Sequence, residues 1–187
     1  MSAGLGFQMH AERTPNPNSI KWVLGESLVP AGVSADFPEP VSESVSPLAA
    51  RLFGVPGVVG VFLAANFVTV TKLEGADWEE LAQPLVDALK AFAASGEVAL
   101  GPQFVSAGPA TDEPVVARIR QILEDEVRPA VAMDGGDVVF VGFRDGVVEV
   151  QLQGACVGCP SSTATLRFGI EGRLREEIPE VQKVISV

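Results

Sequence analysis

Sulfur and imidazole are scarce in this sequence of 187 residues, which contains two cysteines and one histidine. Two cysteines cannot build the disulfide framework of a small secreted domain. The single histidine, His10, lies far upstream of both cysteines, in a different predicted domain. A Ser/His/Asp arrangement for hydrolysis therefore has no support. We expect a protein that is not an enzyme.

Basic residues are also few, since 13 Lys and Arg stand against 24 Asp and Glu. The formal net charge is −11 and the isoelectric point is near 4.5. Neither half of the chain reverses the sign. An acidic surface of this kind repels phosphate backbones and anionic headgroups, so nucleic-acid or membrane-surface binding is not expected.

A long uninterrupted apolar run is missing, although the mean hydropathy is positive at +0.30. No residue between Arg51 and Lys72 is charged, but Pro56, Asn66 and several glycines break this stretch. It is typical of two strands around a turn rather than of a membrane helix. The first residues show neither a signal peptide nor an Arg-rich transit segment, so the expected location is the cytoplasm of a bacterium.

Strand and helix signals alternate over residues 1–96, the first predicted domain. Ser46, followed by Pro47, and Asp77 are typical N-caps of helices. The segment from Ser34 to Ser44 is rich in Pro, Ser and acids and is predicted to be a loop. The predicted order is strand, strand, helix, strand, strand, helix, with strands at residues 7–12, 20–24, 58–63 and 67–71.

Residues 97–112 collect Gly, Pro, Ser and Ala, and are predicted to be a flexible linker. Residues 113–187 form the second predicted domain, with the order helix, strand, strand, helix, strand. Its first helix is expected to end or kink at Arg128 and Pro129. The sequence thus predicts an α+β protein, made of two small two-layer α+β domains joined by a flexible linker.

The two cysteines, Cys156 and Cys159, have C-x-x-C spacing and lie where a predicted strand leads into a predicted helix. Gly158 lets the backbone fold so that both sulfurs converge, and Pro160 suits the first helical position. The positive end of the helix dipole is expected to lower the thiol pKa. No carboxylate within the loop opposes this effect.

Three interpretations of the cysteine pair are open: idle buried thiols, a dithiol oxidoreductase, and a soft-metal or iron–sulfur site. Structural zinc and a [4Fe–4S] cluster both take about four protein ligands. This chain offers only Cys156 and Cys159. A metal site therefore needs external thiols or a symmetric dimer in which each copy donates one pair.

With its surroundings, the C-x-x-C segment resembles a known family. The C-terminal half is similar to the NifU C-terminal domain and the N-terminal half to the Nfu N-terminal domain. The motifs that carry the resemblance are Asp134-Gly-Gly-Asp137, Gln153-Gly-Ala-Cys-Val-Gly-Cys-Pro-Ser-Ser162 and Pro179-Glu-Val181, with Thr14-Pro-Asn-Pro-Asn18, Ser46-Pro-Leu-Ala49 and Val68-Thr-Val-Thr-Lys72 upstream.

The resemblance implies an Nfu-type iron–sulfur carrier that holds a [4Fe–4S] cluster between two subunits. Cys156 and Cys159 are then the cluster ligands. Implied partners are a second copy of the chain, apo iron–sulfur proteins as recipients, and an upstream assembly scaffold as donor. The N-terminal domain has no cysteine and is expected to recognise partners or modulate transfer. A thiol–disulfide oxidoreductase and a dimeric structural zinc protein are the alternatives.

Overall fold

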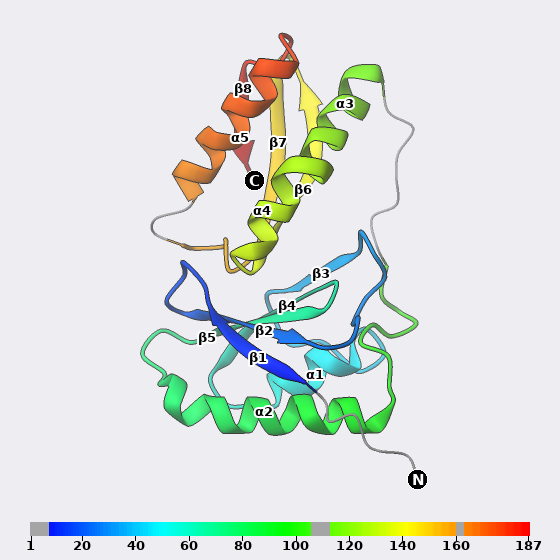
Figure 1. The fold of residues 1–187 in the computed structure, drawn as a ribbon, viewed down its shortest axis with the longest axis vertical. Helices are drawn as coiled ribbons and strands as arrows, with labels where there is room; N and C mark the ends of the chain where they lie inside the picture. Colours follow the sequence, from blue (N-terminus) through cyan, green and yellow to red (C-terminus); the bar gives the residue numbers. More distant parts are fainter. Residues whose placement is uncertain (1–7, 106–112, 160–162) are drawn as a thin grey trace. The chain divides into compact units, whose positions relative to one another are not determined.

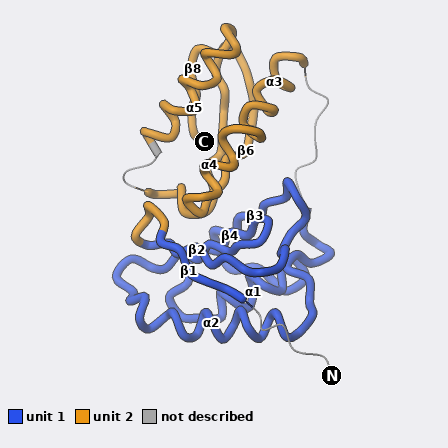
Figure 2. Tube along the Cα trace, viewed as in Figure 1, with its two compact units in different colours: residues 1–13, 18–106 blue, residues 14–17, 107–187 orange. Residues whose placement is uncertain are grey.

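The computed structural model describes residues 8–105, 113–159 and 163–187. The chain divides into two compact units, which are residues 1–13 with 18–106 (unit 1) and residues 14–17 with 107–187 (unit 2; Figure 2). Each unit combines helices with its own sheet and hydrophobic core, which confirms the α+β prediction. None of the helices in the described ranges has the length and apolar content that a bilayer crossing needs.

Unit 1 contains a five-stranded antiparallel sheet with the order β1-β2-β5-β4-β3. The strands are β1 (Met9–Arg13), β2 (Ser19–Leu24), β3 (Ser34–Phe37), β4 (Val58–Ala64) and β5 (Phe67–Lys72). The prediction of a loop from Ser34 to Ser44 is wrong at its start, because β3 pairs with β4 at the sheet edge. Four residues next to a Pro- and Ser-rich segment carry too weak an alternation to be recognised as a strand.

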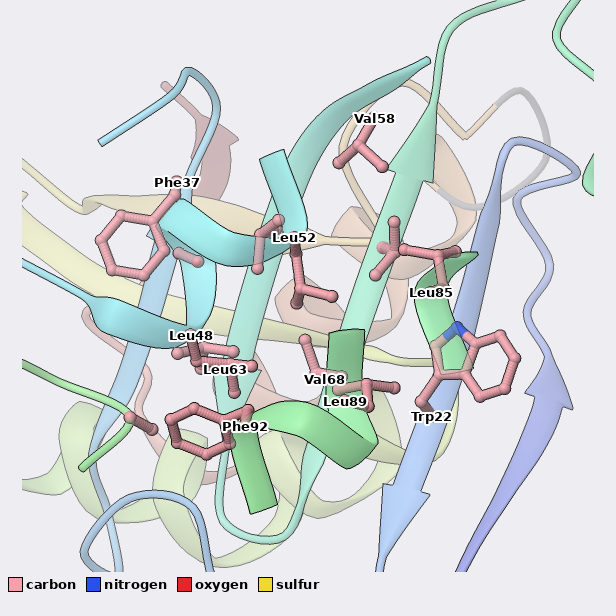
Figure 3. Packing of buried hydrophobic residues seen from close by; sticks show 14 of the residues in the cluster. Trp22, Phe37, Leu48, Leu52, Val58, Leu63, Val68, Leu85, Leu89 and Phe92 are labelled. Atoms are coloured by element: carbon pink, nitrogen blue, oxygen red, sulfur yellow. The ribbon is translucent and has the colours of Figure 1, made fainter. Parts of the chain in front are cut away.

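Two helices, α1 (Pro47–Phe53) and α2 (Trp78–Ser95), cover one face of this sheet (Figure 1). The predicted caps are confirmed: Ser46 accepts the Ala49 N–H at 3.1 Å and Asp77 accepts the Glu79 N–H at 2.9 Å. In Figure 3, leucines of both helices lie among strand residues of the unit 1 core. The predicted α2 stripe is buried, at Leu81, Leu85, Leu89 and Phe92.

Residues 97–105, expected to belong to the linker, contact unit 1 instead. The Ser46 hydroxyl donates to the Ala99 carbonyl oxygen at 2.6 Å, and the Gly101 N–H donates to the Val45 carbonyl oxygen at 2.8 Å. Ala99 is part of the unit 1 core. The composition indicates a linker because small residues and glycine are typical of linkers, but the same residues also suit a segment that packs closely against a core. The rest of the expected linker, residues 106–112, lies outside the described residues.

Unit 2 contains a three-stranded sheet with the order β6-β7-β8. The strands are β6 (Gly136–Arg144), β7 (Val147–Gly154) and β8 (Lys183–Ser186), with β8 parallel to β7. Asp145 and Gly146, both at positive φ, form the predicted tight turn between β6 and β7. Alternate residues of β7 are buried, and helices α3 (Pro114–Ile122), α4 (Arg128–Met133) and α5 (Thr163–Glu177) contribute to the same core (Figure 1).

The helical geometry changes at Arg128, next to Pro129, where the sequence predicts that the first helix of unit 2 ends or kinks. A π-helical turn, η1 (Leu123–Val127), joins α3 to α4, and the Arg128 N–H donates to the Leu123 carbonyl oxygen. Pro129, which has no N–H to donate, is the second residue of α4 and directly follows this irregular turn. The wide turn keeps the chain helical through a proline that normally interrupts it.

Replacing Ser46 with Ala tests the contact between α1 and residues 97–105. The fully buried hydroxyl serves one donor and one acceptor of the backbone, so its loss leaves both without a partner. We expect a loss of about 2 kcal/mol in the free energy of unfolding, measured with urea. Asp77→Ala removes one exposed cap bond and should cost about 1 kcal/mol or less. Equal losses in the two variants would contradict this assignment.

Candidate metal centre

The cysteine loop follows β7 directly, and backbone hydrogen bonds hold the residues on either side of Cys156. The Ala155 N–H donates to the Gly135 carbonyl oxygen and the Val157 N–H to the Gly154 carbonyl oxygen, both at 3.1 Å. Gly158 has φ 67°, in the left-handed region, and a side chain there would meet no atom within 4 Å. Position 158 therefore needs the backbone freedom of glycine, while the predicted convergence of the two sulfurs stays a prediction. The helix opening expected at residues 160–162 lies outside the described residues.

Both cysteine side chains are buried, with 4% of Cys156 and 3% of Cys159 exposed. They are not joined by a disulfide. Cys156 belongs to the hydrophobic core of unit 2, together with Val138 of β6 and Ile170 of α5. The residues predicted as ligands therefore lie at the edge of a packed core rather than on an open surface.

The pKa of the Cys156 thiol is raised to about 12, mainly by burial and then by the nearby Asp134 carboxylate, Cys159 and the Asp137 carboxylate, in that order. The expectation that the helix dipole would lower the thiol pKa is therefore wrong for Cys156. Carboxylates do oppose the thiolate, although they come from the turn before β6 (Asp134) and the start of β6 (Asp137) and not from the cysteine loop. At neutral pH the metal-free Cys156 is a protonated thiol.

An ion pair between Arg128 and Asp137 fixes the start of β6. Nε and Nη2 of Arg128 donate to the two carboxylate oxygens of Asp137, at 2.8 and 2.7 Å. The Val138 N–H donates to the same carboxylate at 2.8 Å, and Arg128 also pairs with Glu124. Asp137 is buried, so the bidentate partner supplies the charge that keeps the carboxylate stable there. In the sequence, residues 134–137 are recognised only as part of a family motif, so the pairing of Asp137 with Arg128 is not predicted.

No further ligand accompanies the cysteines in the part of the chain that the structure describes, where no three His, Cys, Asp or Glu side chains gather as a metal site. Nε2 of His10 lies 2.9 Å from Oε1 of Glu12, and both residues belong to unit 1. Thiol–disulfide exchange needs an accessible thiolate of low pKa, whereas Cys156 is buried and protonated. A soft metal, by contrast, displaces thiol protons when it binds. The arrangement therefore favours a two-thiolate metal site that another molecule completes.

The fold and the site together define a two-domain α+β protein with a candidate C-x-x-C metal site in its C-terminal unit. Comparison with protein families gives the same division. Residues 9–96 match the family described as scaffold protein Nfu/NifU N terminal, and residues 119–185 match the NifU-like domain. The chain belongs to the Nfu iron–sulfur cluster scaffold family, which confirms the resemblance seen in its motifs.

A human relative supports this membership, and two further proteins are similar to the chain. The human protein named "NFU1 iron-sulfur cluster scaffold homolog, mitochondrial" is 42% identical over 182 residues, which are 96% of this chain and 71% of that protein. Arabidopsis thaliana "NifU-like protein 4, mitochondrial" is 39% identical, over 94% of this chain and 64% of that protein. A solved NifU-like protein from Saccharomyces cerevisiae covers 55% of this chain and 92% of its own, with 25% identity and a TM-score of 0.48.

The raised pKa of Cys156 predicts how stability depends on pH. A free thiol has an ordinary pKa of 9.0, so above that pH the unfolded chain ionises while folded Cys156 stays protonated until about 12. The contribution of the protonated Cys156 thiol to the free energy of unfolding is fully present below pH 9, and it is lost as the pH rises towards 12. Relative to Cys156→Ala, the metal-free, reduced protein should lose up to about 1.4 kcal/mol per pH unit in that window. Urea unfolding at several pH values measures it, and parallel pH profiles for the two proteins would contradict it.

Proposed function

We propose that this chain is an iron–sulfur cluster scaffold that holds a [4Fe–4S] cluster between two copies and delivers it to apo iron–sulfur proteins. The observation that carries the proposal is a C-x-x-C loop with two thiols and no third ligand among the described residues, in a chain of the Nfu family. A second copy of the chain and an upstream assembly scaffold as cluster donor are part of the proposal. It acts as a carrier rather than as an enzyme, because the cargo leaves unchanged.

Ligand counting supports the shared site. A cubane cluster takes about four thiolates. One copy supplies Cys156 and Cys159, so two copies related by a twofold axis supply the full set. Each thiol releases its proton as it ligates, and both sulfurs have to become accessible to a cluster that a second copy also holds. The side chains that cover the two sulfurs therefore have to move aside during loading.

The same burial makes release favourable. A proton competes with iron for each sulfur, and it competes best at a thiol whose pKa is raised. After transfer, Cys156 is again a neutral thiol in the core. A site of this kind holds its cargo less tightly than one built from thiolates of low pKa, as delivery to another protein requires. The cytoplasmic location stays a prediction, since the human and Arabidopsis relatives are named as mitochondrial.

The first experiment measures cluster stoichiometry together with assembly state. After anaerobic reconstitution with iron and sulfide, we expect about four irons per two chains and a dimer by light scattering. Cys156→Ser and Cys159→Ser should each abolish both the chromophore and the cluster-dependent dimer. Val157→Ala, which lies between the cysteines and removes no sulfur, is the matched control and should load as wild type does.

The outcomes separate the alternatives. About four irons on a monomer would overturn the shared site, because one chain has only two thiols. Zinc retained in place of iron would indicate a dimeric structural zinc site. A reversible intramolecular disulfide, with no metal bound, would indicate a thiol–disulfide oxidoreductase.

The separate cores of the two units lead to a prediction about the N-terminal domain. The core of unit 2 contains Cys156 and shares no residue with the core of unit 1. A fragment of residues 109–187 keeps this core and both cysteines but lacks residues 14–17 of unit 2, where Nδ2 of Asn16 donates to the Ala155 and Val157 carbonyl oxygens, each at 3.2 Å. We expect the fragment to bind the cluster with the stoichiometry of the whole chain, because both thiols are present. Transfer to some recipients should slow, because the removed domain is proposed to recognise partners. Iron analysis and recipient activation measure the two effects, and failure of the fragment to bind a cluster contradicts this division.

A further inference from the structure

Gly136, the first residue of β6, lies against the Cys156 sulfur. A Cβ atom built at this position would lie 2.5 Å from Sγ of Cys156 and 2.6 Å from the Gln153 carbonyl oxygen. It would also lie 3.2 Å from Cβ of Cys156. Nonbonded heavy atoms are at their best separation at about 3.5–4.0 Å, so no side chain fits here without moving one of these atoms.

The backbone does not explain this glycine. Neighbouring Gly135, Gly154 and Gly158 have φ values of 79°, 63° and 67°, where other residues are strained, whereas Gly136 is not among the residues with positive φ. Any residue could adopt the backbone conformation of Gly136. What excludes a side chain at position 136 is therefore the close approach of Cys156 and of β7.

The start of β6 has little freedom to retreat from Cys156. Gly136 is paired with Gly154 across the β6–β7 ladder, and the next residue, Asp137, is held by the two hydrogen bonds from Arg128. The sulfur, in contrast, stands at the end of a side chain that rotates about a single bond. A methyl group at position 136 would therefore displace the sulfur from its place in the unit 2 core, in addition to pressing on the Gln153 carbonyl.

We propose that Gly136 is a positioning residue for the metal centre. Its missing side chain sets where the Cys156 sulfur lies, and so decides whether Cys156 and Cys159 can ligate the same metal centre. The placement of the sulfur stands on the geometry alone. Only the consequence for the cluster rests on the proposed function.

The variant Gly136→Ala tests the placement in the full chain, with Gly142→Ala as the matched control. Gly142 lies in the same strand, and a Cβ there would make only an ordinary contact of 3.6 Å with Glu149 Oε2. In the metal-free, reduced protein, alkylation by iodoacetamide is followed at each cysteine by mass spectrometry. We expect Cys156 of Gly136→Ala to react at least about tenfold faster than in wild type, because the displaced thiol leaves the core. Gly142→Ala should react at the wild-type rate.

A double-mutant cycle keeps the test valid if Gly136→Ala lowers stability. Cys156→Ala removes the sulfur and leaves the Gln153 carbonyl in place. Gly136→Ala should lower the melting temperature by several degrees in the wild-type background and by clearly less in the Cys156→Ala background. Equal losses in both backgrounds would show that the sulfur contact does not matter, and would overturn the proposal.

Reconstitution with iron and sulfide then tests the consequence for the cluster. Gly136→Ala should bind at least about tenfold less iron at limiting supply, or give an altered absorption spectrum, while Gly142→Ala loads as wild type does. Wild-type alkylation and wild-type loading in Gly136→Ala would overturn the proposal. If wild type itself binds no cluster, the proposed function fails, whereas alkylation and the cycle still decide whether Gly136 places the sulfur.

Discussion

The packing of the turn before β6 against the cysteine loop determines the chemistry of unit 2. Arg128 holds Asp137 through two hydrogen bonds, and this pair fixes the residues beside Cys156. The Ala155 N–H of the cysteine loop donates to the Gly135 carbonyl oxygen of the turn. Through this one contact, Cys156 is buried, lies close to two carboxylates, and is limited in where its sulfur can stand.

Two opposing demands meet at this contact. Iron–sulfur ligation needs thiolates, whereas burial and neighbouring carboxylates favour the neutral thiol. A permanent cofactor site would resolve the conflict in favour of the thiolate. Here burial and the neighbouring carboxylates stabilise the neutral, metal-free Cys156 instead, which suits the cluster delivery that we propose. The same physical property also argues against disulfide exchange, where an exposed thiolate of low pKa is the reactive form.

Much of the fold could be predicted from the sequence because its signals are local. The Ser46 and Asp77 caps, the stripe of α2 and the Asp145–Gly146 turn depend on residues a few positions apart. The errors concern contacts between distant segments. Residues 97–105 are ordered by contacts with residues about 55 positions earlier, such as Ser46 with Ala99, and β3 is a strand only because β4 lies beside it. Pro129 indicates an irregularity in the helix, but nothing local in the sequence indicates that it takes the form of a π-helical turn.

For the candidate site, the sequence by itself determined the number and kind of candidate ligands. Two cysteines with C-x-x-C spacing, the sole histidine in another domain and the family motifs define a candidate site with two thiols, which we propose a second copy of the chain completes. Only the tertiary structure decided the state of those thiols. Two carboxylates that help to raise the pKa of Cys156 belong to Asp134 and Asp137, some twenty positions earlier in the sequence. Gly136, which limits where the Cys156 sulfur lies, is equally far away. Burial and Coulomb interactions depend on distance in space, and the folded chain sets that distance independently of spacing in the sequence.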